Sequence, residues 1–445
     1  MATEAHRRHE TPPGPDGLPL LGNTLSLSRD VLGFYEQAHR NYGDIVRFEV
    51  AGDEGYLLTH PEYIEQVLVN DDAKFVKGEV LNRSIGSALG EGMLLAEGEA
   101  WRAQRTLAQP AFYRERVETY GEAMVTYAAE AAGNWNGALV DVHDAMTELT
   151  LRILARTLFG IDIGDRQSVV REMAEATRTR TDVSSLVGFL PDWVPHPAIR
   201  EYNRALTDVR GFVEGHIAER KAEPPEERGD DLLSLLVTAA EAGDMSDETL
   251  RDNMLTFLFA GHETTALALT YTWFLLGHHP DVQARLHDEL DSVLEGSAPT
   301  TADLPDLEYT GQVVDEAMRR YPPVYTFFRE PTEDVEIGGY TIPEGATLSL
   351  PQWIVHHDER WYESPWEFRP ARWDDWDGPE YAYYPFGGGP RHCIGMRFAR
   401  MEVQLIVATL AQEFAVESRT DAPLDIAAST NAVPADPVGV RFERR

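Results

Sequence analysis

The sequence of 445 residues predicts a mainly α-helical fold with a minor β region, which is an α+β fold. Helical apolar patterns dominate residues 100–320, and short strand-like segments lie on either side of them, at residues 40–60 and 330–350. The sequence contains no internal repeat and no low-complexity linker. We therefore expect a single domain over residues 1–445, in which strands from the two ends pair into small sheets.

The individual elements follow from the local sequence. Residues 1–20 predict an extended, proline-rich lead-in, because proline disfavours helix at its own position and at the one before it. Strands are predicted at residues 44–50, 55–59, 335–342 and 347–350. The last helix is expected from about residue 394 to residue 414, shortly after three consecutive glycines.

The longest apolar run, residues 254–276, is long enough to span a bilayer. His262 and Glu263 lie at its middle, however, where a charge is costly in lipid. Ser246 is a suitable N-cap for a helix here, and Asp247 and Glu248 follow it in the first turn. We therefore predict a buried core helix and no membrane anchor.

The charge balance is strongly acidic. Asp and Glu number 75 against 39 Lys and Arg, which gives a formal net charge of -36, and lysine occurs only at positions 74, 77 and 221. Such a surface repels nucleic acid and anionic lipid. It favours a salt-adapted source such as a halophilic archaeon, because concentrated salt screens the self-repulsion. The alternative is an ordinary acidic cytoplasm in which a GC-rich genome favours arginine.

The compartment is predicted from the cysteine content and the N-terminus. One cysteine permits no internal disulfide, so nothing indicates an oxidising compartment. Met1–Pro13 is polar and lacks the apolar segment of a signal peptide. We expect a cytoplasmic monomer.

The most informative stretch is Phe386-Gly387-Gly388-Gly389-Pro390-Arg391-His392-Cys393-Ile394-Gly395. A metal-binding cysteine must be a thiolate, and the N–H groups of a helix that begins just after it lower its pKa. Glycines let the backbone turn sharply and approach a flat cofactor, and Arg391 and His392 are placed to meet anions on it. The alternative for a lone cysteine is a buried free thiol beside a glycine-rich turn.

Residues 386–395 resemble the heme-binding loop of the cytochrome P450 family, Phe-Gly-x-Gly-x-Arg-x-Cys-x-Gly, at all six fixed positions. The resemblance implies the P450 fold, a triangular helical domain around the heme with small sheets. It implies heme b (iron protoporphyrin IX) as the cofactor and Cys393 as the ligand to the metal. Phe386, Arg391, His392 and Gly395 would bind the cofactor with it.

Glu316 and Arg319 lie three residues apart, so they share one face of a helix. Taken alone, they are an ion pair that contributes ~0 to 1 kcal/mol at a surface. The family resemblance implies a buried structural triad in which the third member is Arg372. The sequence departs from the family at His356-His357-Asp358, where an arginine often stands in the middle.

Trp101 and Arg105 lie four residues apart and stack on one helical face. An indole N–H and a guanidinium both donate to carboxylates, and heme carries two carboxylates into an apolar pocket. The resemblance implies that these two residues hold one propionate and that Arg329, Arg391 and His392 hold the other. The alternative is an exposed basic helix face.

Polar groups interrupt the long apolar run at Ala260-Gly261-His262-Glu263-Thr264-Thr265. Glycine inside a helix costs about 1 kcal/mol relative to alanine, and local rules broken together often mark function. The resemblance implies an oxygen-activating groove at Ala260 and Gly261, in which Thr264 would hydrogen-bond the oxygen being activated and Glu263 would link it to solvent protons. The alternative is a kinked core helix in which Glu263 has a hydrogen-bond partner and no catalytic role.

These residues together predict a heme-thiolate monooxygenase that inserts one atom of O2 into a hydrophobic small molecule such as a fatty acid, terpenoid or steroid-like lipid. The rival predictions are a peroxygenase and a heme-thiolate sensor or carrier. Electrons would come from a separate ferredoxin or flavodoxin with its reductase. The docking face for that donor is predicted around Arg391, Arg397 and Arg400.

The resemblance also predicts which segments line the substrate pocket. They are residues 81–95, 186–194, 259–260, 324–328 and 430–433. The residues singled out within them are Phe259, Val324, Tyr325 and Phe327, and Tyr325 and Thr326 are the polar side chains that could meet a substrate.

Overall fold

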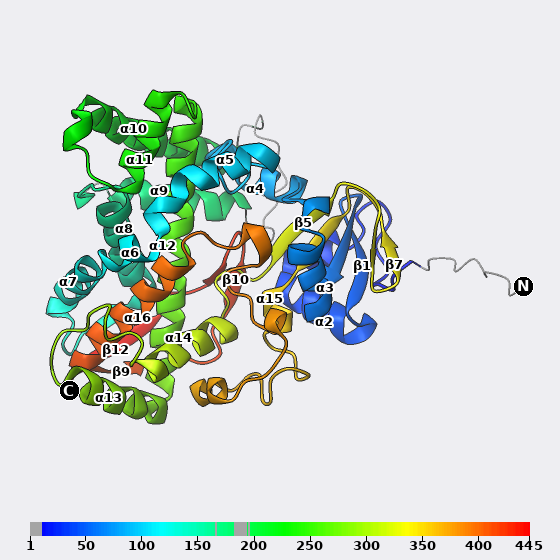
Figure 1. Cartoon of the computed structure of the whole chain (residues 1–445). Coiled ribbons are helices and arrows are strands. Elements are labelled where there is room, and N and C mark those ends of the chain that lie inside the picture. The colour runs from blue at the N-terminus through cyan, green and yellow to red at the C-terminus, as the bar shows by residue number, and fades with distance from the viewer. Residues whose placement is uncertain (1–10, 165–166, 182–193, 195) are drawn as a thin grey trace, which may run out of the picture.

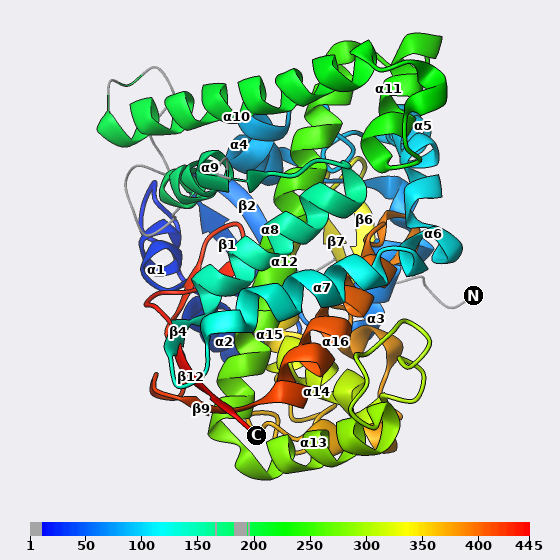
Figure 2. The ribbon, with the colours of Figure 1, turned by 90° about the vertical axis from the view of Figure 1, so that its left-hand side faces the viewer.

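A computed structural model gives the structure of the chain and describes residues 11–164, 167–181, 194 and 196–445. A helix-rich part and a smaller strand-rich part lie side by side (Figure 1). The long helix α12 (Asp247–His278) runs through the middle of the helix-rich part, as both views show (Figures 1 and 2). The mainly helical fold with a minor β region is confirmed.

The N-terminal part mixes helices and strands before residue 98. Its elements are α1 (Thr24–Arg29), α2 (Val31–Tyr42), β1 (Ile45–Val50), β2 (Asp53–Leu58), α3 (Pro61–Glu65), β3 (Phe75–Val76) and α4 (Glu79–Leu89). The two strands predicted here are correct to within two residues at each end. The helices were not predicted, because short helices such as α1 bury no side chain and leave little apolar periodicity.

The middle of the chain is helical, as predicted. Its helices are α5 (Gly98–Ala108), α6 (Arg114–Glu118), α7 (Gly121–Ala131), α8 (Val142–Leu158), α9 (Gln167–Thr181), α10 (Pro197–Ala222), α11 (Leu232–Ala242), α12, α13 (Pro280–Leu294) and α14 (Glu308–Arg320). One short strand, β4 (Leu139–Asp141), interrupts them.

The C-terminal part returns to short strands around one long helix. Its elements are β5 (Phe327–Pro331), β6 (Val335–Ile337), β7 (Tyr340–Ile342), β8 (Thr347–Leu350), α15 (Gln352–Val355), α16 (Met396–Glu413), β9 (Phe414–Ser418), β10 (Ile426–Ala428), β11 (Ala432–Pro434) and β12 (Gly439–Arg444). The strand predicted over residues 335–342 is instead the hairpin β6–β7. Gly338 and Gly339 form its turn with positive φ, which bulkier residues rarely adopt.

The largest sheet has the strand order β1-β2-β8-β5-β3. β2 pairs in parallel with β8, with Gly55 opposite Thr347, so strands from the two ends of the chain share one sheet, as predicted. A second sheet has the order β4-β12-β9, and β10 and β11 form a separate hairpin. Of the predicted lead-in, residues 1–10 lie outside the described residues, and Leu18 and Gly22 form a β-bridge within the remainder.

Helix α12 is a buried core helix, as predicted. The Ser246 side chain caps it by accepting a hydrogen bond from the Thr249 backbone N–H at 3.0 Å. Its second half is almost entirely buried, and Trp273 has no accessible surface. Among the described residues, no helix is long and apolar enough to cross a membrane.

Candidate active site

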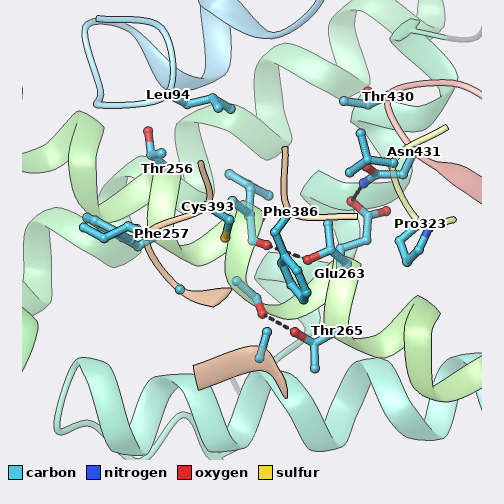
Figure 3. A pocket seen from close by; sticks show the side chains of 18 of the residues that line it. Leu94, Thr256, Phe257, Glu263, Thr265, Pro323, Phe386, Cys393, Thr430 and Asn431 are labelled. Carbon is cyan, nitrogen blue, oxygen red and sulfur yellow. Dashed lines mark hydrogen bonds between the residues drawn. The ribbon is translucent and has the colours of Figure 1, made fainter. Parts of the chain in front are cut away.

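A cavity of about 440 Å³ lies beside the middle of α12, and Figure 3 shows residues that line it. Its wall is mainly apolar. Of the predicted stretches, residues 259–260 and 324–328 line it throughout, as do Thr430 and Asn431 and much of residues 81–94. Leu95, Ala432 and Val433 are not among the lining residues, and residues 186–193 lie outside the described part of the chain. The four singled-out side chains, Phe259, Val324, Tyr325 and Phe327, all contribute to the wall.

Cys393 presents its sulfur to this cavity (Figure 3). The loop before α16 is fixed by a hydrogen bond from the Cys393 backbone N–H to the Phe386 carbonyl at 2.9 Å. Gly389 has φ +61°, and a Cβ there would stand 1.9 Å from the Leu68 carbonyl oxygen. Because no side chain fits at that position, the sharp loop that presents the sulfur requires a glycine.

The Cys393 side chain is exposed to the cavity, whose wall is mainly apolar. Burial raises the pKa of the thiol above its ordinary value of 9.0, whereas the Gly395 backbone N–H and the charges of Arg105 and Lys77 act in the opposite direction. The N–H groups at the start of α16 therefore assist the anion, as predicted, without outweighing burial. A bound metal ion would keep the sulfur deprotonated, because its charge exceeds these neighbouring effects.

Cationic side chains gather next to the sulfur. The Arg391 guanidinium lies over the Trp101 ring at 4.3 Å and donates to the Ala96 carbonyl at 2.7 Å. Arg105 lies 5.9 Å from the same ring and donates to the His392 carbonyl at 3.0 Å. The structure thus brings together the four residues Trp101, Arg105, Arg391 and His392.

Glu97 is the partner of Arg391 that the sequence analysis missed. Its carboxylate forms an ion pair with Arg391, and it also accepts a hydrogen bond from the Lys77 backbone N–H at 2.7 Å. The charge of Arg391 is therefore already balanced within the chain. No spacing rule links residue 97 to residue 391, so a pattern could not reveal the pair.

Arg329, Lys77 and Arg105 are the basic residues of this cluster that lack a carboxylate partner among the described residues. Arg329 is 7% exposed and donates to the Phe328 carbonyl at 2.8 Å, and burial lowers the pKa of its guanidinium to about 10. Burial and the charges of Arg329 and Arg391 lower the pKa of the Lys77 ammonium well below its ordinary value. Basic groups without a carboxylate partner, crowded together at an apolar cavity, form a site for anions, because a bound anion stabilises their charged forms.

This arrangement fits the heme that the resemblance implies. The cavity is mainly apolar, one sulfur faces it, and the cations without carboxylate partners at its edge suit the two carboxylates of the cofactor. Lys77 was not predicted. Its only signal is that it is one of three lysines in an arginine-rich chain.

On α12, the predicted groove residues line the cavity together. The helix is continuous through residues 260–265. Thr264 Oγ1 donates to the Ala260 carbonyl at 2.9 Å, one turn back. At Gly261 a Cβ would stand 2.1 Å from Leu154 Cδ1 of α8, so the Leu154 side chain would have to shift to admit one.

Glu263 is held from outside its own helix. Its Oε2 accepts a hydrogen bond from Asn431 Nδ2 at 3.0 Å, which Figure 3 shows as a dashed line. Burial raises the pKa of the carboxyl above its ordinary value of 4.5, against the opposing charge of Arg178 and the Asn431 hydrogen bond. Arg178, on α9, also lines the cavity. A carboxyl with a raised pKa can carry a proton at a pH where an exposed one would not.

Glu316, Arg319 and Arg372 meet in a buried network. Glu316 Oε1 accepts from both Arg319 Nη2 and Arg372 Nε at 2.9 Å, and the Glu316 and Arg319 side chains are fully buried. Arg319 Nη1 also donates to the His356 carbonyl at 2.7 Å. His357, where the family often has arginine, accepts a hydrogen bond from Arg320 at 2.8 Å. The surface-pair interpretation of Glu316 and Arg319 is therefore wrong for this chain.

The three arginines of the predicted docking face differ in their surroundings. Arg397 is exposed, whereas Arg400 is paired with Asp315 at 2.8 Å. Arg391 is directed inward, against Trp101 and Glu97. Of the three, Arg397 is the most available to a partner.

Comparison with known proteins covers nearly the whole chain. Residues 12–442 match the family model described as Cytochrome P450. The chain is 37% identical to cyclooctat-9-en-7-ol 5-monooxygenase of Streptomyces melanosporofaciens, with 90% of this chain and 88% of the relative covered. It is 36% identical to cyclooctatin synthase of the same organism, with 91% and 89% covered. It is 32% identical to pentalenene oxygenase of Streptomyces avermitilis, with 92% of each covered.

Proposed function

The chain belongs to the cytochrome P450 family, and from this premise we propose that Cys393 is its metal ligand and that Glu263 and Thr264 deliver its protons. The protein is a heme-thiolate monooxygenase with heme b as its cofactor, and it acts on a hydrophobic small molecule with O2 and electrons from a redox partner. When bound, heme supplies the one-electron and oxygen chemistry.

In this proposal the heme carboxylates are held by Lys77 and Arg329 together with Trp101, Arg105 and His392. Lys77 and Arg329 lack carboxylate partners among the described residues, whereas Arg391 is already paired with Glu97. Arg391 would therefore orient Trp101 and the cysteine loop, and its charge would attract the heme carboxylates less than the charges of Lys77 and Arg329 do. Phe386, which lines the cavity beside Cys393, would shield the sulfur from water.

Proton delivery is proposed to use two atoms on α12. Burial raises the pKa of the Glu263 carboxyl, so this group can hold a proton that it received from solvent. Thr264 Oγ1, whose hydrogen bond is now made to the Ala260 carbonyl, would present a hydroxyl proton at the cavity surface. The apolar wall at Phe257 and Phe259 limits the entry of other water.

We propose a terpenoid hydrocarbon or alcohol as the substrate class. The relatives include a cyclooctat-9-en-7-ol 5-monooxygenase and a pentalenene oxygenase. The wall offers apolar side chains such as Leu81, Ile85 and Phe327, with Tyr325 and Thr326 as polar neighbours. This combination suits a compact, mostly hydrocarbon ligand.

The finer parts of the function are also proposals. The redox partner would be a separate ferredoxin or flavodoxin with its reductase, docking near Arg397. The protein would be a cytoplasmic monomer from a salt-adapted source. The single cysteine supports a separate electron donor and a compartment without disulfides, and the net charge of -36 supports a salt-adapted source.

The observation that carries the proposal is the Cys393 sulfur facing an apolar cavity edged by cations without carboxylate partners. The test is the absorption spectrum of the reduced, carbon monoxide-bound protein. Wild type is expected to give the strongly red-shifted band of thiolate ligation, and Cys393→Ala is expected to lose it. A band that persists in Cys393→Ala contradicts the proposed ligand.

The variant Thr264→Ala separates the monooxygenase from a sensor or carrier. It is expected to keep the red-shifted band but to release a larger share of its electrons as hydrogen peroxide, because proton delivery is impaired. A protein that never consumes electrons with substrate present would be a sensor or carrier. An enzyme that forms product equally well from added peroxide in wild type and in Thr264→Ala would be a peroxygenase.

A further inference from the structure

One side chain links the C-terminal hairpin to the acid on α12. Asn431 lies in the turn between β10 and β11, and its Nδ2 donates to Glu263 Oε2 at 3.0 Å. Asn431 is 9% exposed and lines the same cavity as Glu263 (Figure 3). The two residues are 168 positions apart in the chain. The hydrogen bond therefore depends on where the hairpin is anchored.

The hairpin is anchored directly beside Asn431. The Ala432 backbone N–H donates to the Pro323 carbonyl at 2.8 Å, and the Tyr271 hydroxyl of α12 donates to the Ala432 carbonyl. The Ser429 backbone N–H closes the turn on the Asn431 carbonyl at 3.0 Å. These bonds leave the Asn431 amide little freedom, because the backbone on both of its sides is held.

The Glu263 carboxyl has few other neighbours that affect its charge. From α9, Arg178 acts on it through its positive charge, and from α12, Tyr271 lies within electrostatic range. The neighbouring side chains of Thr264 and His262 make their hydrogen bonds elsewhere. Thr264 Oγ1 is hydrogen-bonded to the Ala260 carbonyl, and His262 Nδ1 is hydrogen-bonded to the Leu258 carbonyl. Among the described residues, Asn431 is thus the side chain that hydrogen-bonds the Glu263 carboxylate.

We propose that Asn431 is a positioning residue that holds the Glu263 carboxyl at the cavity wall and so couples the substrate-lining hairpin to proton delivery. The inference rests on the proposed function, because it assigns a second residue to the same proton route. Asn431 itself carries no titrating proton, so its effect is exerted only through Glu263.

The physical consequence has a definite sign. A donor to a carboxylate stabilises the charged form, so the Asn431 hydrogen bond lowers the pKa of Glu263 against the effect of burial. Removing the donor therefore raises that pKa. The pH range over which the acid holds a proton then extends upward.

The experiment uses the heme-loaded protein with its electron donor and compares four variants with wild type. Asn431→Leu keeps the branched side-chain shape, although it is bulkier, and removes the donor, and Asn431→Asp keeps the shape but adds a second carboxylate. Asp425→Asn is the matched control, since Asp425 lies exposed on the same hairpin and does not line the cavity. Glu263→Gln identifies the signals of the acid itself. The reduced, carbon monoxide-bound spectrum shows which variants fold around their heme.

Two quantities are measured. Infrared difference spectra across a pH series follow the carbonyl stretch of the protonated carboxyl that disappears in Glu263→Gln. Product formed per electron pair consumed is measured across the same pH series. Both report on the acid, whereas a purely structural role of Asn431 would change only the amount of folded protein.

The infrared midpoint is the pH at which half of the protonated-carboxyl signal is lost. We expect it to move upward in Asn431→Leu and further upward in Asn431→Asp, because two adjacent carboxylates share a proton. The amount of product formed per electron pair falls by about tenfold or more in both variants. The pH at which this amount declines, here called the pH limb, moves upward like the infrared midpoint. Asp425→Asn matches wild type. An infrared midpoint and a pH limb that stay in place in both Asn431 variants overturn the inference.

Failure of the proposed proton relay is distinguishable from failure of this inference. If the pH limb survives in Glu263→Gln, the relay through Glu263 is wrong, and with it the coupling of the hairpin to proton delivery. If the limb is lost in Glu263→Gln but unchanged in both Asn431 variants, the relay stands and the role of Asn431 is wrong.

Discussion

At the scale of single residues, the site is shaped by charges that the chain itself leaves unbalanced. Arg391 has Glu97, and Arg319 and Arg372 share Glu316. By contrast, Lys77 and Arg329 have no carboxylate partner among the described residues. An uncompensated cation beside an apolar cavity costs stability, and a bound anion relieves that cost. We therefore propose that the residues that bind the cofactor most strongly are those whose charges are unpaired without it.

The first prediction concerns Lys77. Lys77→Met is expected to speed the loss of heme by about tenfold or more. The heme carboxylate that Lys77 would pair with would then be buried without a cation. Lys77→Arg should restore most of the retention. The measurement is the rate of heme transfer to a heme-scavenging protein.

Lys74→Met is the matched control for this prediction. Lys74 belongs to the same short segment, but it is an exposed residue paired with Asp71 at 3.3 Å. Equal rates of heme loss in Lys74→Met and Lys77→Met would show that Lys77 does not hold the cofactor.

The second prediction concerns Glu402 on α16. Its side chain is fully buried, both carboxyl oxygens lack a hydrogen-bond partner among the described residues, and burial raises its pKa well above the ordinary 4.5. A group with a raised folded pKa binds its proton more tightly in the folded state. Above pH 4.5, wild type therefore loses up to about 1.4 kcal/mol of stability per pH unit, until the folded pKa is reached.

Glu402→Gln removes that titration, so the variant gains stability relative to wild type as the pH rises above 4.5. The free energy of unfolding, measured by denaturant titration at several pH values, checks the slope. Glu413→Gln, at the exposed end of the same helix, is the control and should keep the pH dependence of wild type. Parallel pH curves for Glu402→Gln and wild type would mean that Glu402 is not a protonated acid in the folded protein.

At the scale of elements, α12 and α8 approach each other closely where the candidate groove lies. Thr150 Oγ1 of α8 donates to the His262 carbonyl of α12 at 3.1 Å, and Leu154 occupies the space that a Cβ at Gly261 would need. The glycine that breaks helix propensity thus has a packing reason. It lets a second helix support the segment that carries Glu263 and Thr264.

The third prediction concerns the contact between Gly261 and Leu154. Gly261→Ala gains about 1 kcal/mol of helix propensity, but it forces Leu154 and α8 to move, which costs about 1–3 kcal/mol. We expect a net loss of stability in the wild-type background and a gain in the Leu154→Ala background. Denaturant unfolding of the two single variants and the double variant gives the coupling energy. Additive effects within about 0.5 kcal/mol would remove the packing explanation.

At the scale of the whole molecule, two buried apolar clusters and sheets of mixed origin hold the chain together. The larger cluster surrounds α8, α12 and α16, and the smaller one lies against the sheet in which β2 pairs with β8. Because this sheet draws strands from both ends of the sequence, we propose that the chain unfolds as a single domain. The strongly acidic surface opposes this compactness through self-repulsion.

The fourth prediction follows from the net charge of -36. The free energy of unfolding is expected to rise with potassium chloride, most steeply up to about 1 M, where the Debye length falls to about 3 Å. Uncharged sucrose, matched for osmolality, separates screening from osmolyte exclusion. Stability that does not change on removal of salt would argue against a salt-adapted source.

The sequence by itself determined the parts that depend on local spacing. Residues 386–395 specify the cysteine loop, the apolar run around Glu263 specifies a buried helix, and Trp101 and Arg105 share a face because they are four positions apart. Each of these features is encoded within one continuous segment of the chain. Such features are visible in a sequence because backbone periodicity fixes which side chains are neighbours.

The tertiary structure alone decided which distant groups meet. It paired Glu97 with Arg391, left Lys77 without a carboxylate partner, placed Leu154 against Gly261 and joined Asn431 to Glu263. These contacts join segments far apart in the chain, so no periodicity records them. Their formation depends on how the helices and the C-terminal hairpin pack, and packing is a property of the folded whole.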